Sequence, residues 1–69
     1  MFRLKELRKE KNISQIKLAM DLEINQNSIS RYETGLYEAD YKTLIAIADY
    51  FDVSVDYLLG RTENRKINR

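Results

Sequence analysis

Apolar residues recur at helical spacing along most of the chain, and the pattern predicts five short helices joined by tight connections. Phe2, Leu4 and Leu7 form a stripe near the start, and a broad apolar face runs from Leu44 to Phe51. The predicted helices cover residues 2–11, 15–22, 26–34, 41–51 and 55–59. The chain has two glycines and no proline, so little in it favours a β-sheet and nothing breaks a helix. The predicted fold class is therefore all-α, a compact five-helix bundle.

Polar residues at the ends of the apolar stretches set the predicted helix boundaries. Serine, asparagine and aspartate cap helix N-termini, whereas asparagine and glycine end helices in the left-handed conformation. The predicted N-caps are Ser14, Asn25, Asp40 and Ser54, and the predicted stops are Asn12, Gly35 and Gly60. Lys17 lies in the first turn of its helix, where its charge opposes the helix dipole. Either an anion binds there or the lysine is simply tolerated at the surface.

Residues 15–33 have the pattern of two helices that cross steeply over a short turn. The apolar positions of this segment are Leu18, Leu22, Ile24, Ile29 and Tyr32. Ala19 is a small residue on the inner side of the first helix, where it lets a second helix cross closely. This combination predicts a helix-turn-helix unit over residues 14–35.

The opposite side of the second helix of this unit is polar without being acidic. It carries Gln26, Asn27, Ser30 and Arg31. Glutamine and asparagine can pair bidentately with adenine, and arginine with guanine, while a helix fits the major groove. The face therefore predicts binding to double-stranded DNA, although an ordinary solvated helix face is the other interpretation.

Four motifs follow one another in a familiar order: Ser14-Gln15, Leu18-Ala19, the run from Ile29 to Gly35 and the run from Val53 to Gly60. Together they resemble the DNA-binding domain of the Cro/CI-type (XRE-family) helix-turn-helix regulators, over about residues 3–61. The resemblance implies a lambda-repressor-like fold that binds operator DNA as a transcriptional regulator or repressor, usually as a dimer.

The resemblance also implies roles for single residues. Gln26, Asn27 and Arg31 fall where the family reads bases. Gln15 and Ser30 fall where it contacts phosphate or neighbouring bases.

Two basic residues are implied to act near the DNA backbone. Arg8 falls where some members pair an arginine with a glutamate of the reading helix, here Glu33, which would orient Arg8 near the backbone and keep Glu33 from repelling phosphate. Lys17 is placed to reach phosphate as well.

The chain departs from the family pattern at three positions. Glu23 stands in the turn where the family often has glycine with a positive φ, which costs about 1 kcal/mol or forces a different turn. Tyr37 and Ala39 replace a basic residue and a proline, which puts a backbone contact from that loop in doubt, although the Tyr37 hydroxyl can still donate. Glu38 and Asp40 would repel DNA unless they point away.

Composition removes several classes of function. Cysteine and histidine are both absent, which excludes disulfides, thiol catalysis, zinc sites of the Cys/His type and histidine acid–base chemistry. The carboxylates are scattered and no glycine-rich phosphate loop occurs, so an enzyme is not expected. No cofactor, metal or small-molecule ligand is expected either.

Charge is concentrated at the two ends of the chain. Residues 1–11 hold five basic and two acidic residues, residues 61–69 hold four and one, and the stretch between holds three and eight. The expected division is a DNA-binding domain over 1–61 and a flexible basic tail over 62–69. No signal peptide or membrane-spanning run is visible, so a cytoplasmic location with no membrane partner is expected.

The last predicted helix carries three large residues in a row. Tyr57, Leu58 and Leu59 cannot all be buried by so short a helix, so an exposed remainder is the candidate surface of a homodimer. The other interpretation is a plug against the first helix. The alternative function is a protein-interaction module on the same fold, antitoxin- or antirepressor-like, which the acidic middle and Tyr37 would suit.

Overall fold

The computed structural model describes residues 2–36 and 38–67, and within them it contains five α-helices and no strand, as predicted. They are α1 (Leu4–Glu10), α2 (Gln15–Leu22), α3 (Gln26–Thr34), α4 (Tyr41–Tyr50) and α5 (Val55–Leu58). Helix α1 begins two residues later than predicted, and α1, α4 and α5 each end one residue earlier.

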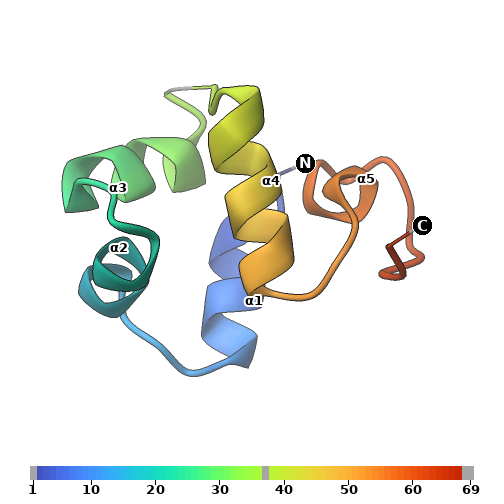
Figure 1. The fold of residues 1–69 in the computed structure, drawn as a ribbon, viewed down its shortest axis with the longest axis horizontal. Helices are drawn as coiled ribbons and strands as arrows, with labels where there is room; N and C mark the ends of the chain where they lie inside the picture. The colour runs from blue at the N-terminus through green and yellow to red at the C-terminus, as the bar shows by residue number, and fades with distance from the viewer. Residues whose placement is uncertain (1, 37, 68–69) are drawn as a thin grey trace.

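The helices are arranged on two sides of a central pair (Figure 1). Helix α4 runs down the middle of the molecule in front of α1, with α2 and α3 on one side and α5 and the C-terminal segment on the other. In the described part of the chain no helix is long and apolar enough to cross a bilayer.

Every helix contributes to a single core. Each supplies one of the five largest fully buried side chains, Leu4, Leu18, Ile29, Ile47 and Leu58. The core is completed by Leu7, Ala19, Ala48, Phe51, Val53 and Tyr57. Leu18, Ala19 and Ile29 are all buried, so α2 and α3 each turn an apolar face inward, and the outer face of α3 is polar.

All four predicted N-caps are present. The side-chain oxygens of Ser14, Asn25, Asp40 and Ser54 accept backbone hydrogen bonds from Lys17, Asn27, Thr43 and Tyr57, at 2.7 to 3.0 Å. These bonds satisfy amides that a helix start leaves without a partner, so the boundaries of α2 to α5 are fixed locally.

All five helices end in the same way, with one residue in the left-handed conformation. These residues are Asn12, Glu23, Gly35, Asp52 and Gly60, with φ between 55° and 81°. The residue that follows each donates its amide to the carbonyl five positions earlier, at 2.9 to 3.3 Å. The three predicted stops are confirmed. Glu23 keeps the positive φ of the family turn without glycine. The left-handed residue Asp52, which follows α4, was not predicted.

The exposed remainder predicted for the last helix is confined to Leu59, so Tyr57 and Leu58 are wrong as candidates for a dimer surface. Tyr57 is 4% exposed and Leu58 is fully buried, whereas Leu59 is half-buried. The segment before α1 explains the burial: the Arg3 amide donates to the Leu58 carbonyl at 2.8 Å, and the Arg3 guanidinium lies 4.3 Å from the Tyr57 ring centroid. Tyr57 and Leu58 therefore close the core.

The C-terminal segment lies against this same corner. The Arg65 carbonyl accepts the Ser54 amide at 2.9 Å, and the Arg65 guanidinium binds both carboxylate oxygens of Glu10, at 2.9 and 2.7 Å. The guanidinium also lies 5.0 Å from the Tyr57 ring centroid. The basic tail expected to be flexible over 62–69 is thus attached at Arg65, and residues 68 and 69 lie outside the described residues.

Candidate nucleic-acid interface

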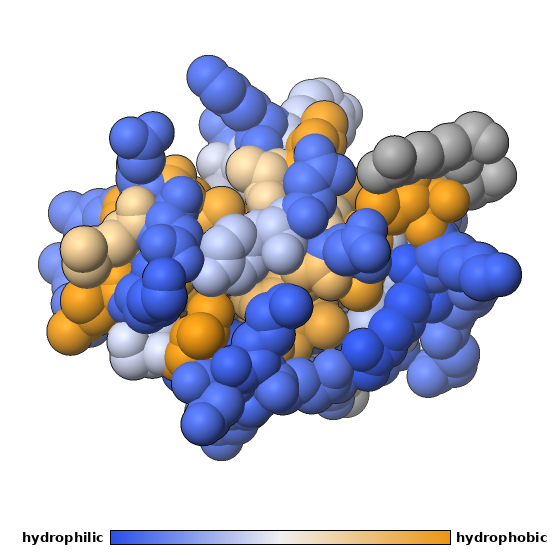
Figure 2. All heavy atoms as spheres, turned by 60° about the horizontal axis from the view of Figure 1, so that its bottom comes forward, coloured by the Kyte–Doolittle hydropathy of each residue, from blue (hydrophilic) through white to orange (hydrophobic). Residues whose placement is uncertain are grey.

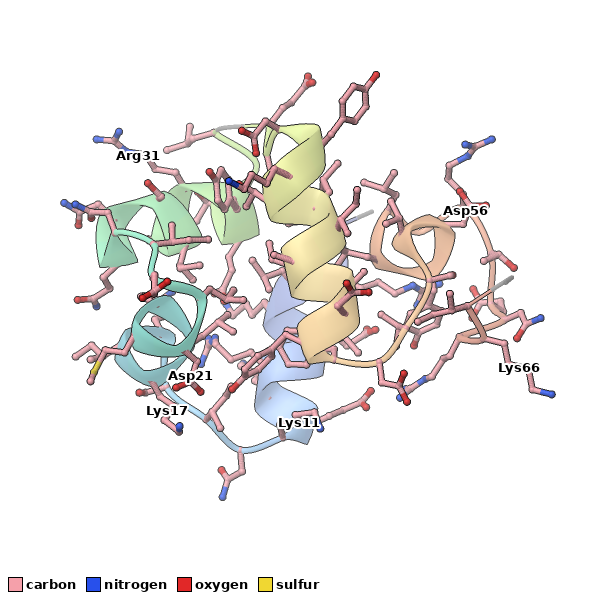
Figure 3. All side chains as sticks on the ribbon, viewed as in Figure 1. Lys11, Lys17, Asp21, Arg31, Asp56 and Lys66 are labelled. Carbon is pink, nitrogen blue, oxygen red and sulfur yellow. The ribbon has the colours of Figure 1, made fainter. Side chains whose placement is uncertain are left out.

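The outer face of α3 gathers the four polar residues predicted to meet DNA. Gln26, Asn27 and Arg31 are exposed and Ser30 is half-buried, while Ile29 on the opposite side is fully buried. Figure 3 shows Arg31 projecting away from the body of the molecule. The face therefore offers amide, hydroxyl and guanidinium groups on a helix that stands at one side of the fold (Figure 1).

A largely buried charge network joins α1, α2 and α3 at the C-terminal turn of α3. Glu33 of α3, whose side chain is 2% exposed, accepts from Arg8 Nε at 2.7 Å and from Arg8 Nη2 at 3.3 Å. Arg8 Nη1 donates to the Ile13 carbonyl at 2.9 Å. Gln15 Nε2, at the start of α2, donates to Glu33 Oε1 at 3.0 Å. The Arg8–Glu33 pair implied by the family resemblance is therefore present.

The hydrogen bonds of this network limit which of its residues can contact a ligand. The Arg8 side chain is only 13% exposed and its three nitrogens are all engaged, so Arg8 holds Glu33 and the Ile13 carbonyl from inside the fold. Gln15 is half-buried, with one amide hydrogen given to Glu33. This bond holds the Gln15 side chain against the C-terminal turn of α3.

Lys17 is exposed, and the structure gives it an acidic partner on its own helix. Its Nζ lies 2.9 and 3.1 Å from the carboxylate oxygens of Asp21, one turn further along α2. Tyr50 Oη, from the last turn of α4, donates to Asp21 Oδ2 at 2.6 Å. The hydrogen bond from Tyr50, followed by that from Lys17, lowers the pKa of Asp21, and Asp21 in turn raises the pKa of both partners.

Asp21 and Tyr50 were not among the predicted site residues. The i, i+4 spacing of Lys17 and Asp21 is a signal that could have identified that pair. Tyr50 carries no such signal, since it lies 29 residues from Asp21 and meets it only because α4 packs beside α2.

The loop before α4 holds the acidic residues that were expected to oppose DNA. Asp40 caps α4, and its hydrogen bonds with Thr43 lower the pKa of its carboxyl. Glu38 is exposed, and Tyr37 lies outside the described residues. Asp40 therefore has a structural partner of its own.

A surface groove of about 830 Å³ runs between this loop and the corner where α5 ends. It is lined by Phe2, Tyr32, Gly35, Glu38, Ala39, Asp40, Tyr41, Leu44 and Leu59. Tyr41 on its rim is 86% exposed. Leu59 lines this groove. It is the predicted dimer residue that stays half-buried, whereas Tyr57 and Leu58 lie in the core.

Apolar side chains also interrupt the polar surface of α2. Ile16 and Met20, one turn apart, are 55% and 72% exposed. Figure 2 shows hydrophobic residues among polar ones at the α2–α3 end of the molecule.

The helix-turn-helix family matches residues 4–58 of the chain. This segment runs from the first residue of α1 to the last residue of α5, so the match covers all five helices. No solved structure matches the chain significantly.

Bacterial regulators align with nearly the whole chain. The HTH-type transcriptional regulator YqaE of Bacillus subtilis (strain 168) is 45% identical over 64 residues, 93% of this chain and 55% of that protein. The HTH-type transcriptional regulator ImmR of the same organism is 39% identical over 66 residues, 96% of this chain and 52% of that protein. The HTH-type transcriptional activator BcrR of Enterococcus faecalis is 34% identical over 61 residues, 88% of this chain and 30% of that protein. The chain thus spans about half the length of YqaE and ImmR.

Proposed function

The chain belongs to the helix-turn-helix family of DNA-binding transcriptional regulators, and from this premise we propose that it binds duplex operator DNA with α3 in the major groove. Gln26, Asn27 and Arg31 read base edges, because their amides and guanidinium have the donor and acceptor pattern that adenine and guanine present there. The observation that carries the proposal is the outer face of α3, which is polar, exposed and without a carboxylate over residues 26–31.

The DNA backbone is met by residues beside this face. Gln15 and Ser30 lie at its edge, and Lys17 supplies a cation from the first turn of α2. Arg8 acts from beneath, since its bonds to Glu33 fix the position of α3 and neutralise a carboxylate that would otherwise repel phosphate.

We propose that the protein works as a homodimer whose second copy packs on the groove beside Leu59. A single domain reads few base pairs, whereas two copies on half-sites about 34 Å apart multiply the discrimination. The groove offers the apolar side chains of Leu44, Leu59 and the highly exposed Tyr41. Leu36, 76% exposed and next to the groove residue Gly35, extends the apolar area that a second copy would cover.

In this proposal the protein has no enzymatic activity and acts in the cytoplasm, where bacterial DNA is found. Its role is to occupy an operator and change the transcription of neighbouring genes. Relatives include a protein named as an activator, so membership of the family does not by itself imply repression.

Selection of bound duplexes from a random oligonucleotide pool tests the proposal. The expected result is a palindromic site whose half-sites are one helical turn apart. On that site, Arg31→Ala should cost about 1–3 kcal/mol and relax the preference at one base pair of each half-site. Lys66→Ala is the control, because Lys66 lies at the opposite end of the molecule from α3 (Figure 3).

The exposed apolar residues Ile16 and Met20 favour a second candidate, a protein-interaction module on the same fold. The two functions differ in their response to salt. Binding to DNA weakens steeply as salt rises, because neutralised phosphates release counterions, whereas binding through apolar side chains changes little. A pool that yields no enriched sequence, together with salt-independent binding to a protein, would overturn the DNA-reading function.

A further inference from the structure

We propose that Asp21, held by Tyr50, is a built-in competitor of DNA for the Lys17 ammonium and so limits the affinity of the protein for the phosphate backbone. The inference rests on the proposed function, because it assigns Lys17 to a phosphate. It adds two positioning residues, Asp21 and Tyr50, that lie outside the reading helix.

The geometry makes the Lys17–Asp21 pair more than a chance surface contact. Both carboxylate oxygens of Asp21 lie within 3.1 Å of Lys17 Nζ, so the ammonium contacts both of them. An exposed pair on one helix is ordinarily mobile and contributes little. Here the carboxylate is anchored from a second helix by the 2.6 Å hydrogen bond from Tyr50 Oη.

Tyr50 is itself well placed to act as an anchor. It is half-buried at the end of α4, and its ring packs edge-on against the buried Phe51 with centroids 5.0 Å apart. The hydroxyl therefore meets Asp21 from a fixed position, and the carboxylate cannot follow the lysine when the lysine turns toward another anion. Lys17, by contrast, has an exposed side chain that can turn.

The charges of Lys17 and Asp21 determine how this part of α2 interacts with DNA. In the free protein the Lys17–Asp21 pair is neutral, so this part of α2 attracts phosphate no more than an uncharged surface does. To contact a phosphate, Lys17 must leave Asp21, and the carboxylate that stays behind repels the same phosphate. Replacing the aspartate by its amide removes both effects while keeping a side chain that accepts from Tyr50.

The experiment measures binding of a labelled 30-base-pair duplex of random sequence, across a series of salt concentrations, by fluorescence anisotropy. Asp21→Asn should bind about fivefold to tenfold more tightly than the unaltered protein near 0.1 M salt, with a salt slope steeper by about one unit, as expected for one added phosphate contact. Tyr50→Phe, which frees the carboxylate without removing it, should bind more tightly by a smaller factor.

Two controls separate this effect from a general change in charge. Asp56→Asn makes the same substitution on α5, which Figure 3 shows on the opposite side of the molecule from Lys17, and should change the affinity by less than twofold. Lys17→Ala combined with Asp21→Asn should lose the gain in both affinity and slope, since the competing groups are then both absent. Circular dichroism confirms that each variant is folded.

Failure of the competition and failure of the proposed function give different binding results. If Asp21→Asn binds the duplex no more tightly than the unaltered protein, or keeps its gain when Lys17 is removed, the competition is overturned and the proposed function stands. If the folded unaltered protein and Asp21→Asn both bind no duplex even at low salt, the proposed function itself fails, and the inference fails with it.

Discussion

Glu33 is the residue on which the candidate interface depends most directly, because its carboxylate is buried and fully occupied. It accepts from Arg8 of α1 and from Gln15 of α2, while its own helix carries the candidate interface. One side chain thus joins three helices through its hydrogen bonds.

Glu33→Gln tests this role through stability. Breaking a buried charge pair leaves the partner charge without compensation, so the free energy of unfolding should fall by about 3–5 kcal/mol, measured by urea denaturation. Asp56→Asn breaks the exposed pair between Asp56 and Arg61, and it should change the unfolding free energy by about 0.5 kcal/mol or less. Similar losses in the two variants would mean that burial of Glu33 contributes nothing.

Glu23 is strained by its backbone, since it holds a φ of 56° at the end of α2. Glu23→Gly should raise the stability by up to about 1 kcal/mol, because glycine adopts this conformation without a Cβ clash. A higher thermal unfolding midpoint is the expected result. Lys5→Gly, in the first turn of α1, provides the contrast: glycine in an ordinary helical position should lower stability, by up to about 1 kcal/mol.

At the scale of elements, the crossing of α2 and α3 depends on one small residue. Ala19 is buried, and its carbonyl accepts the Ile24 amide in the turn at 2.9 Å. Ala19→Leu should lower the unfolding free energy by about 1–3 kcal/mol, because the larger side chain has to push the two helices apart. Met20→Leu changes the neighbouring exposed position and should leave the thermal midpoint unaltered. An unchanged midpoint for Ala19→Leu would contradict this view of the crossing.

The elements themselves could be predicted from the sequence because their determinants are local. Ser14 and Asn25 cap the helices that follow them within three residues, and Gly35 ends α3 by its own conformation. The outward face of α3 follows from the helical repeat once Ile29 is assigned to the core.

The features that could not be predicted all depend on residues far apart in the sequence. Tyr57 is covered by Arg3, which lies 54 positions earlier, so no spacing within α5 could indicate its burial. Asp21 is anchored by Tyr50 across 29 positions. Because local patterns report only neighbours along the chain, these contacts appear only once the helices are packed.

At the scale of the whole molecule, the two ends of the chain are joined at one corner. Arg65 binds Glu10 of α1 through two hydrogen bonds, while Arg3 pairs with Glu63 at 3.0 Å and donates to the Tyr57 carbonyl at 2.9 Å. The corner lies at the end of the fold opposite α3 (Figure 1). The contacts at this corner therefore involve residues other than those of the candidate interface on α3.

The Arg65–Glu10 contact predicts how stability responds to acid. The hydrogen bonds from Arg65 lower the pKa of the Glu10 carboxyl below its ordinary value of 4.5, so the folded protein favours the ionised form more than the unfolded chain does. The contribution of this ion pair to the free energy of unfolding is complete above the ordinary pKa and is lost as the pH falls through the lowered one.

In Glu10→Gln this part of the acid dependence should disappear. Thermal midpoints measured from pH 7 down to pH 3 should fall less steeply for that variant than for the unaltered protein, whereas Glu38→Gln, in an exposed position of the loop before α4, should reproduce the unaltered slope. Parallel slopes for Glu10→Gln and the unaltered protein would show that the Arg65–Glu10 pair does not form in solution.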